Sequence, residues 1–466
     1  MSEGAAKKED RRKFQAIRGT RDLLPPETAL WNRVEQTAHE VFYTFGFAEI
    51  RVPIFEPTEL FARAVGSDTD IVSKEMFSFT DPANVIKTLV QDALQAGLGV
   101  DVKNIDHAFQ SSSEEKVQFI SLRPEATASV CRAYIEHGMQ QLPQPVKLYY
   151  TGPMFRRERP QKGRYRQFYQ IGAEVLGGSD APAIDAEVIE MVMTFFDRLE
   201  LQGVQLDINS IGCRDCRPKY VELLRAELLK VKDKLGPDSQ RRIETNPLRV
   251  LDSKLESEQG IIATLPHIAD HLCEDCAKHY AEVKRQLQLR GVMYRENWRL
   301  VRGLDYYMRT TFEITAVGLG SQNAVCGGGR YDGLVELLGG PPTKGIGFAI
   351  GEDRLILSLQ ESGKAPTSQG RDVYIAWMGE RAHATAVRAA KGLRKAGYSV
   401  ELPPMEQKLG KALGQADKLG ARFALILGDN EVASGEWTVK TLADGSQQKL
   451  TEQQLLDFLR KGRSGE

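Results

Sequence analysis

The sequence has no apolar run long enough to span a bilayer, almost no net charge and few cysteines. Its 466 residues include 6 cysteines, and 62 Lys and Arg nearly balance 63 Asp and Glu. The missing apolar run argues against a membrane protein, and the cysteine count argues against a disulfide scaffold. The first residues, MSEGAAKKEDRRKFQ, are charged and lack the apolar core of a secretory signal. We therefore expect a cytoplasmic protein whose polyanion site, if it has one, is local.

The usual nucleotide-binding fingerprints are also missing. No Walker A motif occurs, and the glycines of GIGFAIGEDRL (345–355) do not have the spacing of a dinucleotide loop. Arg354 is expected in the first turn of the helix after this segment, where a cation opposes the helix dipole. An anionic ligand such as phosphate would relieve that conflict. The alternative is an incidental salt bridge to Glu352 or Asp353.

Positive charge is concentrated in FRRERPQKGRYRQFYQIGAEVLG (155–177). Residues 147–156 and 167–176 both alternate, which predicts an antiparallel hairpin with a long charged tip. Arg156 ends the first strand, and Gln170 and Glu174 share one face of the second. An arginine cluster suits phosphate because the guanidinium is planar and bidentate. The alternative is a solvated surface, but the polar row on the facing strand favours a cleft.

The rest of the chain divides into recognisable regions. Helical spacing of apolar residues predicts a helix over 30–46, followed by a strand over 47–56 that Pro53 confines to an edge or an interface. Residues 213–297 are charged and helical, which is typical of an inserted module. From 371 on, strands alternate with helices, which predicts a small α/β domain with mostly parallel pairing.

The cysteines include two C-x-x-C pairs, one at each end of the helical module. They are Cys213 with Cys216 and Cys273 with Cys276. Four thiolates in two such knuckles fit a structural tetrahedral Zn²⁺ site. The alternative is that the two pairs never meet.

Taken in order, these segments resemble the histidyl-tRNA synthetase family, a branch of the class II aminoacyl-tRNA synthetases. GFAEIRVPIFE (46–56), the basic hairpin and GIGFAIGEDRL resemble class II motifs 1, 2 and 3. LVRGLDYY (300–307) and GGGRYDGL (327–334) resemble the two histidine-specific signatures. The resemblance extends from RGTRDLLP (18–25) to the end of the chain.

This resemblance implies an α+β fold and a division into domains. The catalytic domain would be built on an antiparallel sheet with flanking helices, interrupted by a helical insertion and followed by a C-terminal α/β anticodon-binding domain. The implied boundaries are 1–212 and 298–360 for the catalytic domain, 213–297 for the insertion and 371–466 for the anticodon-binding domain.

The resemblance also implies the reaction and its participants. Histidine and ATP would give histidyl-adenylate, and the histidyl group would pass to the 3′ end of tRNA(His), with Mg²⁺ bridging the pyrophosphate oxygens. Motif 1 would form a homodimer interface.

Residue roles follow from the same resemblance. Arg156 and Arg302 would act on the α-phosphate, Arg354 on the γ-phosphate and Arg164 on the ATP tail. The histidine-binding set would be Glu125 and Thr127 for the amino group, Gln170 for the carboxylate, and Glu174, Tyr306, Tyr307 and Tyr331 for the imidazole.

Two departures from the family pattern stand out. Ala126 in LRPEAT takes the place of a glycine usual in the family, and a methyl group there would shift the loop near the amino group. The segment over 82–120 is longer than the family pattern leads us to expect.

Two other functions compete with the ligase. One is the regulatory paralogue that supports ATP phosphoribosyltransferase, which shares the catalytic fold without aminoacylating tRNA. It lacks the anticodon-binding domain, whereas this chain continues for about a hundred residues after the catalytic segments. The other is a nucleic-acid-binding module that uses only the basic loop. It would show no dependence on histidine.

Overall fold

The computed structural model describes residues 14–66, 69–79, 119–301, 306–317, 323–364 and 370–463. The chain forms two compact units, and the boundary between them falls at residue 365. The short segment 24–30 groups with the second unit. No helix in these ranges is both long enough and apolar enough to cross a membrane. The long segment expected over 82–120 lies almost wholly outside the described residues.

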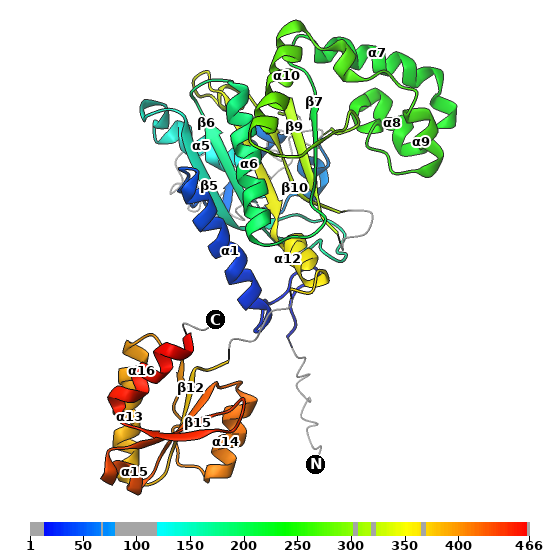
Figure 1. Ribbon diagram of the computed structural model, residues 1–466. Helices are drawn as coiled ribbons and strands as arrows, with labels where there is room; N and C mark the ends of the chain where they lie inside the picture. Colours follow the sequence, from blue (N-terminus) through cyan, green and yellow to red (C-terminus); the bar gives the residue numbers. More distant parts are fainter. Residues whose placement is uncertain are drawn as a thin grey trace, which may run out of the picture. The chain divides into compact units, whose positions relative to one another are not determined.

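An eight-stranded sheet forms the centre of the first unit (Figure 1). Its order is β1-β5-β6-β11-β10-β9-β7-β8, and every pair is antiparallel except β1–β5 and β7–β8 at the edges. The antiparallel sheet predicted from the sequence is therefore confirmed. In chain order, the strands are β1 (Ala48–Glu49), β5 (Val146–Phe155), β6 (Gln167–Leu176), β7 (Gln205–Ser210), β8 (Arg295–Glu296), β9 (Met308–Thr315), β10 (Ala324–Arg330) and β11 (Gly345–Gly351).

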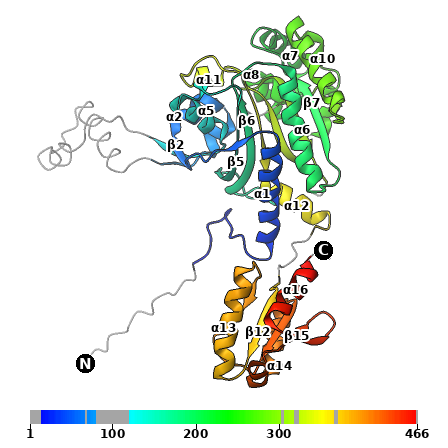
Figure 2. The same cartoon turned by 60° about the vertical axis from the view of Figure 1, so that its left-hand side comes forward.

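Helices α1 (Glu27–Thr44) and α6 (Pro182–Arg198) cover one face of this sheet and lie side by side (Figure 2). The ring of Phe42 on α1 lies 5.8 Å from that of Phe195 on α6 and 5.9 Å from that of Phe348 on β11. The helix predicted over 30–46 is confirmed as Glu27–Thr44, and its predicted apolar positions Leu30, Val34, Ala38 and Val41 are buried. These helices leave the opposite face of the sheet to the functional site.

The predicted hairpin is strands β5 and β6, paired over ten positions from Val146–Leu176 to Phe155–Gln167. Residues 156–166 form its tip. Strand β11 pairs with the other side of β6, which places Gln170 and Glu174 in the middle of the sheet.

The strand predicted over 47–56 forms only toward its two ends, and residues 50–54 between them are not a strand. Only the flanking residues are strands, β1 and β2 (Phe55–Pro57). The guanidinium of Arg123 explains the difference, because its Nη1 donates to the carbonyl oxygens of Val52 (2.7 Å) and Pro53 (3.3 Å). A side chain thus takes the backbone acceptors that a neighbouring strand would have used, and Pro53 has no N–H to offer.

Smaller elements complete the region around the large sheet of the first unit. They are β2, β3 (Ser78–Phe79) and β4 (Ile120–Leu122) in a three-stranded sheet, with α2 (Thr58–Val65), α5 (Thr127–Glu136), α11 (Leu334–Leu337) and α12 (Glu352–Glu361).

The region predicted to be a helical module contains four α-helices: α7 (Arg217–Lys230), α8 (Pro237–Thr245), α9 (Glu256–Ile262) and α10 (Glu274–Leu289). The first three stand beyond the end of the sheet (Figure 1). They surround an apolar core of their own, which includes Tyr220, Leu224 and Ile243. Helix α10 instead packs along α6.

The second unit holds a five-stranded sheet in the order β13-β12-β14-β15-β16. Its strands are β12 (Val373–Trp377), β13 (Val400–Glu401), β14 (Phe423–Leu427), β15 (Trp437–Thr441) and β16 (Gln447–Leu450), and its helices are α13 (Glu380–Lys395), α14 (Leu409–Lys418), α15 (Asp429–Ser434) and α16 (Glu452–Arg463). The α/β class is confirmed, but the pairing is not mostly parallel. Only the pairs of β12 are parallel, because β14, β15 and β16 follow one another as antiparallel neighbours.

Candidate active site

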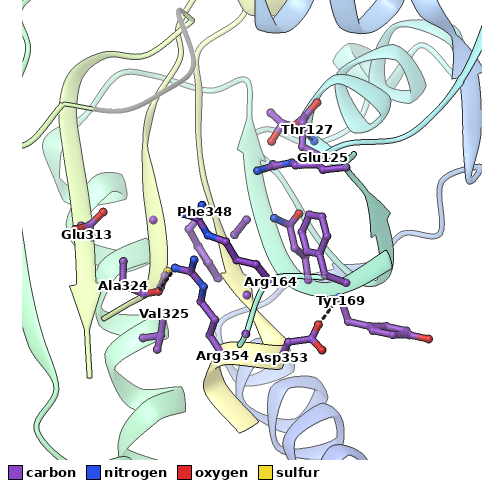
Figure 3. A pocket seen from close by; sticks show the side chains of 18 of the residues that line it. Glu125, Thr127, Arg164, Tyr169, Glu313, Ala324, Val325, Phe348, Asp353 and Arg354 are labelled. Carbon is purple, nitrogen blue, oxygen red and sulfur yellow. Dashed lines mark hydrogen bonds between the residues drawn. The ribbon is translucent and has the colours of Figure 1, made fainter. Parts of the chain in front are cut away.

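One cleft of about 490 Å³ on the open face of the large sheet gathers nearly all of the predicted site residues (Figure 3). The predicted residues that line it are Glu125, Thr127, Arg156, Arg164, Gln170, Glu174, Tyr306, Tyr307, Tyr331 and Arg354. Arg302 lies outside the described residues. The cleft has two chemically different ends, a carboxylate end around Glu174 and an arginine end around Arg354.

Glycines in β11 form part of the floor of this cleft. Gly347 stands opposite Glu174 in the register of the sheet, and Gly351 stands opposite Gln170. A methyl group on Gly347 would overlap the Glu174 carboxylate. Gly347 therefore leaves the space that the Glu174 side chain occupies.

Glu174 is the centre of the carboxylate end. It is 1% exposed, and both of its oxygens accept hydrogen bonds. Thr127 Oγ1 donates to Oε1 at 2.7 Å, and the Tyr331 hydroxyl donates to Oε2 at 2.5 Å. Burial raises the pKa of Glu174 to about 8 despite these donors. The carboxyl group is thus held in one orientation and is desolvated.

Glu125 is fixed by the start of α5. Its Oε2 accepts from the backbone N–H of Thr127 at 2.7 Å, and its Oε1 accepts from that of Ala128 at 3.0 Å. Burial raises the pKa of this carboxyl group as well. Ala126, which replaces a family glycine, has φ −113° and lies outside the left-handed region. Its methyl group therefore causes no backbone strain there.

Gln170 and three tyrosines surround these carboxylates. Oε1 of Gln170 is buried and accepts no hydrogen bond from the described residues, so this oxygen can accept one from a ligand. The rings of Tyr306 and Tyr307 lie 4.7 Å apart, and those of Tyr306 and Tyr331 lie 5.7 Å apart. The carboxylate end is therefore an aromatic box with directed acceptors.

At the other end, Arg156 and Arg164 extend from the hairpin tip and share one acid, Glu158. Arg164 Nη1 lies 3.2 Å from a Glu158 carboxylate oxygen, and Arg156 Nη1 lies 4.0 Å from the other. Arg156 also donates from Nε to the Pro124 carbonyl at 2.9 Å. Its guanidinium lies over the ring of Phe168 at 5.2 Å. Among the described residues, Glu158 is the one acid within ion-pair distance of both arginines.

Arg354 is in the first turn of α12, as predicted, and its Nη1 donates to the Ala324 carbonyl at 3.0 Å. The alternative of a salt bridge to its neighbours is wrong. Asp353 instead pairs with Arg21 at 3.1 Å and accepts from the Tyr169 N–H at 2.9 Å (Figure 3). Burial, followed by the repulsion of Arg164, lowers the pKa of Arg354. An anion would relieve this repulsion.

Several lining residues were not anticipated from the sequence. They are Glu158, Phe168, Asp252, Lys254 and Glu313. Phe168 and Glu158 carried a weak signal, because both lie in the basic hairpin and Phe168 shares the face of Gln170. The other three come from the helical module and from β9. Only the folded chain brings them to the cleft.

The four cysteines of the two C-x-x-C pairs meet at a second site. Their sulfur atoms all lie within 4.8 Å of one another. Cys213 Sγ lies 3.7 Å from that of Cys216 and 3.8 Å from that of Cys273, and the sulfurs of Cys216 and Cys276 are 3.9 Å apart. Four sulfurs placed tetrahedrally at about 2.3 Å from a zinc ion would be about 3.8 Å apart. The alternative that the pairs never meet is wrong, and the donor set fits Zn²⁺.

Comparison with known proteins agrees with this arrangement. A model of the histidyl-tRNA synthetase family matches residues 90–355, and a model of the anticodon-binding domain matches residues 372–462. A histidine–tRNA ligase of Koribacter versatilis is 51% identical over 451 residues, which are 96% of each chain. One from Solibacter usitatus is 51% identical over 95% of this chain and 98% of its own.

A solved structure extends the similarity to the fold. The crystal structure of apo Staphylococcus aureus histidyl-tRNA synthetase has a TM-score of 0.74 and 35% identity, and the match covers 96% of this chain and 100% of that one. The match to the anticodon-binding domain also distinguishes this chain from the regulatory paralogue, which is expected to lack that domain. The chain belongs to the histidyl-tRNA synthetase family of class II aminoacyl-tRNA synthetases.

Proposed function

We propose that this cleft carries out the histidine–tRNA ligase reaction of the family with the residues named above. Histidine and ATP form histidyl-adenylate and pyrophosphate there, and the histidyl group then passes to the 3′ end of tRNA(His). One observation supports this most strongly. A buried, oriented carboxylate set and a group of arginines short of anionic partners share a single cleft.

The carboxylate end takes histidine. Glu174 accepts the imidazole N–H, with Tyr306, Tyr307 and Tyr331 around the ring. Glu125 and Thr127 bind the α-amino group, since carboxylate and hydroxyl oxygens accept its hydrogens. The Gln170 amide donates to the substrate carboxylate and aims it at ATP. An analogue without the imidazole N–H would leave the buried Glu174 carboxylate without the hydrogen bond that the substrate adds to those of Thr127 and Tyr331, which penalises its binding.

The arginine end takes the triphosphate. Arg156 faces the α-phosphate, together with Arg302, while Arg354 binds the γ-phosphate and Arg164 the rest of the ATP tail. As the histidine carboxylate attacks the α-phosphorus, negative charge grows on the phosphate oxygens. Fixed guanidinium groups stabilise that charge more in the transition state than in the ground state. No side chain needs to act as an acid or a base.

Glu158 and Glu313 supply carboxylate oxygens at the arginine end, which suits Mg²⁺. Both line the same cleft as Arg354, which supports a Mg²⁺ position near the proposed phosphate site. The ion would neutralise charge on the pyrophosphate as it leaves.

The remaining assignments concern the whole chain. Residues 1–212 and 298–360 form the catalytic domain, 213–297 the insertion and 371–466 the domain that binds the tRNA anticodon. The 30–56 region forms a homodimer interface, which the exposure of Tyr43 (79%), Ile54 (44%) and Phe55 (61%) supports. The protein acts in the cytoplasm.

The cysteine site takes a structural Zn²⁺ as its thiolate complex. The edges of the sulfur tetrahedron and the burial of three of the four cysteines support this choice. Elemental analysis of protein purified without chelators should give about one zinc per chain.

ATP–pyrophosphate exchange, measured with each amino acid in turn, tests the proposed function. We expect exchange with histidine alone. Equal exchange with other amino acids would contradict the assignment of the carboxylate end. A folded protein that exchanges with none would favour the regulatory paralogue.

A further inference from the structure

The four-cysteine site lies where both ends of the helical insertion meet the start of β9. Cys216 directly precedes α7, and Cys273 directly precedes α10. Met308, the first residue of β9, packs among Cys213, Cys216 and Cys276. Met308 therefore joins the cysteine site to the preceding residue, Tyr307, which lines the substrate cleft.

Hydrogen bonds tie the first cysteine pair to this segment. Arg217, the residue after Cys216, donates from Nη1 to the Tyr307 carbonyl at 2.5 Å. Just before Cys213, the backbone of Ile211 and Gly212 exchanges hydrogen bonds of 2.8 Å each with Arg309. Arg309 has φ +50°, a conformation that a residue with a side chain rarely adopts unless its surroundings hold it.

The restraint continues through side chains to the carboxylate end. Tyr307 packs into the apolar core of the insertion. Its neighbour Tyr306 contacts both Tyr307 and Tyr331, and Tyr331 donates to Glu174. A continuous set of contacts therefore runs from Cys216 to the carboxylate assigned to the imidazole. At the arginine end, neither the ion pair of Arg164 with Glu158 nor the hydrogen bond of Arg354 to Ala324 involves residues 306–309.

The charges around the site suit a metal–thiolate complex. Zn²⁺ with four thiolates has a net charge of about −2. Arg309 acts electrostatically on Cys276, and its guanidinium pairs with Asp180 at 2.7 Å. Arg217 follows Cys216 in the chain, and its backbone N–H donates to the Cys213 carbonyl at 3.0 Å. Cations that contact the ligands of a metal both balance its charge and fix the ligands.

We propose that zinc at this site is a positioning element for the histidine pocket. By joining both ends of the insertion to the start of β9, it fixes Tyr306 and Tyr307 against Tyr331 and Glu174, and so sets the affinity for histidine but not for ATP. This inference rests on the proposed zinc site and on the proposed role of the carboxylate end. Arg217 is the residue that transmits the restraint from the metal site to the pocket.

The test compares histidine and ATP in the full-length protein, before and after removal of zinc with a chelator. We expect KM for histidine in pyrophosphate exchange to rise about 10-fold or more, the range seen when groups that support a metal site are lost. KM for ATP should change less than twofold. Calorimetric titration with histidine alone should show the same loss of affinity, which makes the readout independent of turnover.

Three variants distinguish the loss of zinc, the loss of the positioning contact and a general loss of stability. Cys276→Ser should lose zinc and reproduce the effect of the chelator. Asp275→Asn, next to that ligand but exposed, should keep both zinc and histidine affinity. Arg217→Gln should keep zinc and still raise KM for histidine, with a melting temperature close to that of Asp275→Asn.

The possible failures are distinguishable. Protein with histidine-dependent exchange but no zinc would overturn the metal site, and this inference with it, while leaving the proposed reaction intact. If zinc is present and its removal leaves KM for histidine unchanged, the positioning role is wrong. Equal increases in KM for histidine and ATP would show general loosening, which also contradicts the inference.

Discussion

The two ends of the cleft differ in how far their charged side chains are buried and in how those side chains are paired. At the carboxylate end, Glu174 and Glu125 are at most 4% exposed, and their hydrogen bonds are made by the protein itself. At the arginine end, the side chains of Arg156 and Arg164 are 20% and 37% exposed and share a single acid. The difference indicates that the choice of amino acid depends on preorganised, desolvated hydrogen bonds. Phosphate binding depends instead on charge that stays accessible until the ligand arrives.

Removal of the Glu174 side chain should have the largest effect. In Glu174→Ala, kcat/KM for histidine should fall about 10⁴-fold, the scale on which sites that read an N–H discriminate. KM for ATP should stay within a few fold. Steady-state exchange at varied histidine and varied ATP measures both.

Glu174→Gln is the matched control because it keeps an acceptor oxygen for the imidazole N–H. It should lose much less than the alanine variant. If the two variants lose activity equally, or if KM for ATP rises in parallel, the separation of the two ends is wrong.

Loss of an arginine should cost less and should affect the chemical step. Arg156→Ala should slow single-turnover adenylate formation by about 10²–10³, the usual effect of losing one donor to developing charge. Histidine affinity should be retained. Arg156→Lys should recover only part of the rate, because an ammonium group cannot reproduce the planar fork. Arg302→Ala should behave like Arg156→Ala, and an unchanged rate in either stable variant would end its catalytic assignment.

The titration of Glu174 should also appear in the dependence of kcat/KM for histidine on pH. Burial raises the pKa of Glu174 to about 8, so the free enzyme gains its carboxylate as pH rises through that value. We expect kcat/KM for histidine to rise roughly tenfold between pH 7 and pH 9, since this parameter reports groups of the free enzyme. Glu174→Gln should lack this rise. Its persistence in the variant would assign the titration to another group.

Glu352 is a second buried carboxyl group, and it contrasts with Glu174. It lies behind the arginine end at the start of α12, and neither of its oxygens has a hydrogen-bond partner among the described residues. Burial, with the nearby acids Glu35 and Asp353, raises the pKa of Glu352 well above its usual value. An acid with a raised folded-state pKa favours folding at low pH. That contribution is lost as pH rises from about 4.5 toward the folded pKa.

Glu352→Leu should therefore stabilise the protein by about 1–3 kcal/mol at pH 8, the usual cost of an unpaired buried polar group. The gain should shrink toward pH 5. Glu352→Gln removes only the ionisation and should flatten the dependence of stability on pH. Urea unfolding at several pH values measures both variants, and a destabilised leucine variant would show that Glu352 has a partner in solution.

Local patterns predicted much of this molecule. The hairpin, the face shared by Gln170 and Glu174, and Arg354 in the first turn of α12 all follow from periodicity and from the rules of helix ends. The strand predicted over 47–56 is interrupted at residues 50–54 because a distant side chain, Arg123, satisfies the backbone there, and no local pattern contains that information.

The remaining parts depended on tertiary packing. Glu313, Asp252 and Lys254 reach the cleft only because the sheet and the insertion bring distant segments together. Whether the two cysteine pairs meet depended on how the insertion folds back, which spacing alone left open. Arg302 lies outside the described residues, so its role stays a prediction.

A double-mutant cycle tests the central claim, that the two ends act separately, most directly. Single-turnover adenylate formation would be measured at varied histidine for the wild type, Glu174→Gln, Arg354→Ala and the double variant. Our account predicts that the two effects on transition-state free energy add within about 0.5 kcal/mol, as for independent sites. A coupling of about 1 kcal/mol or more would contradict it, because the two ends would then act as a single unit.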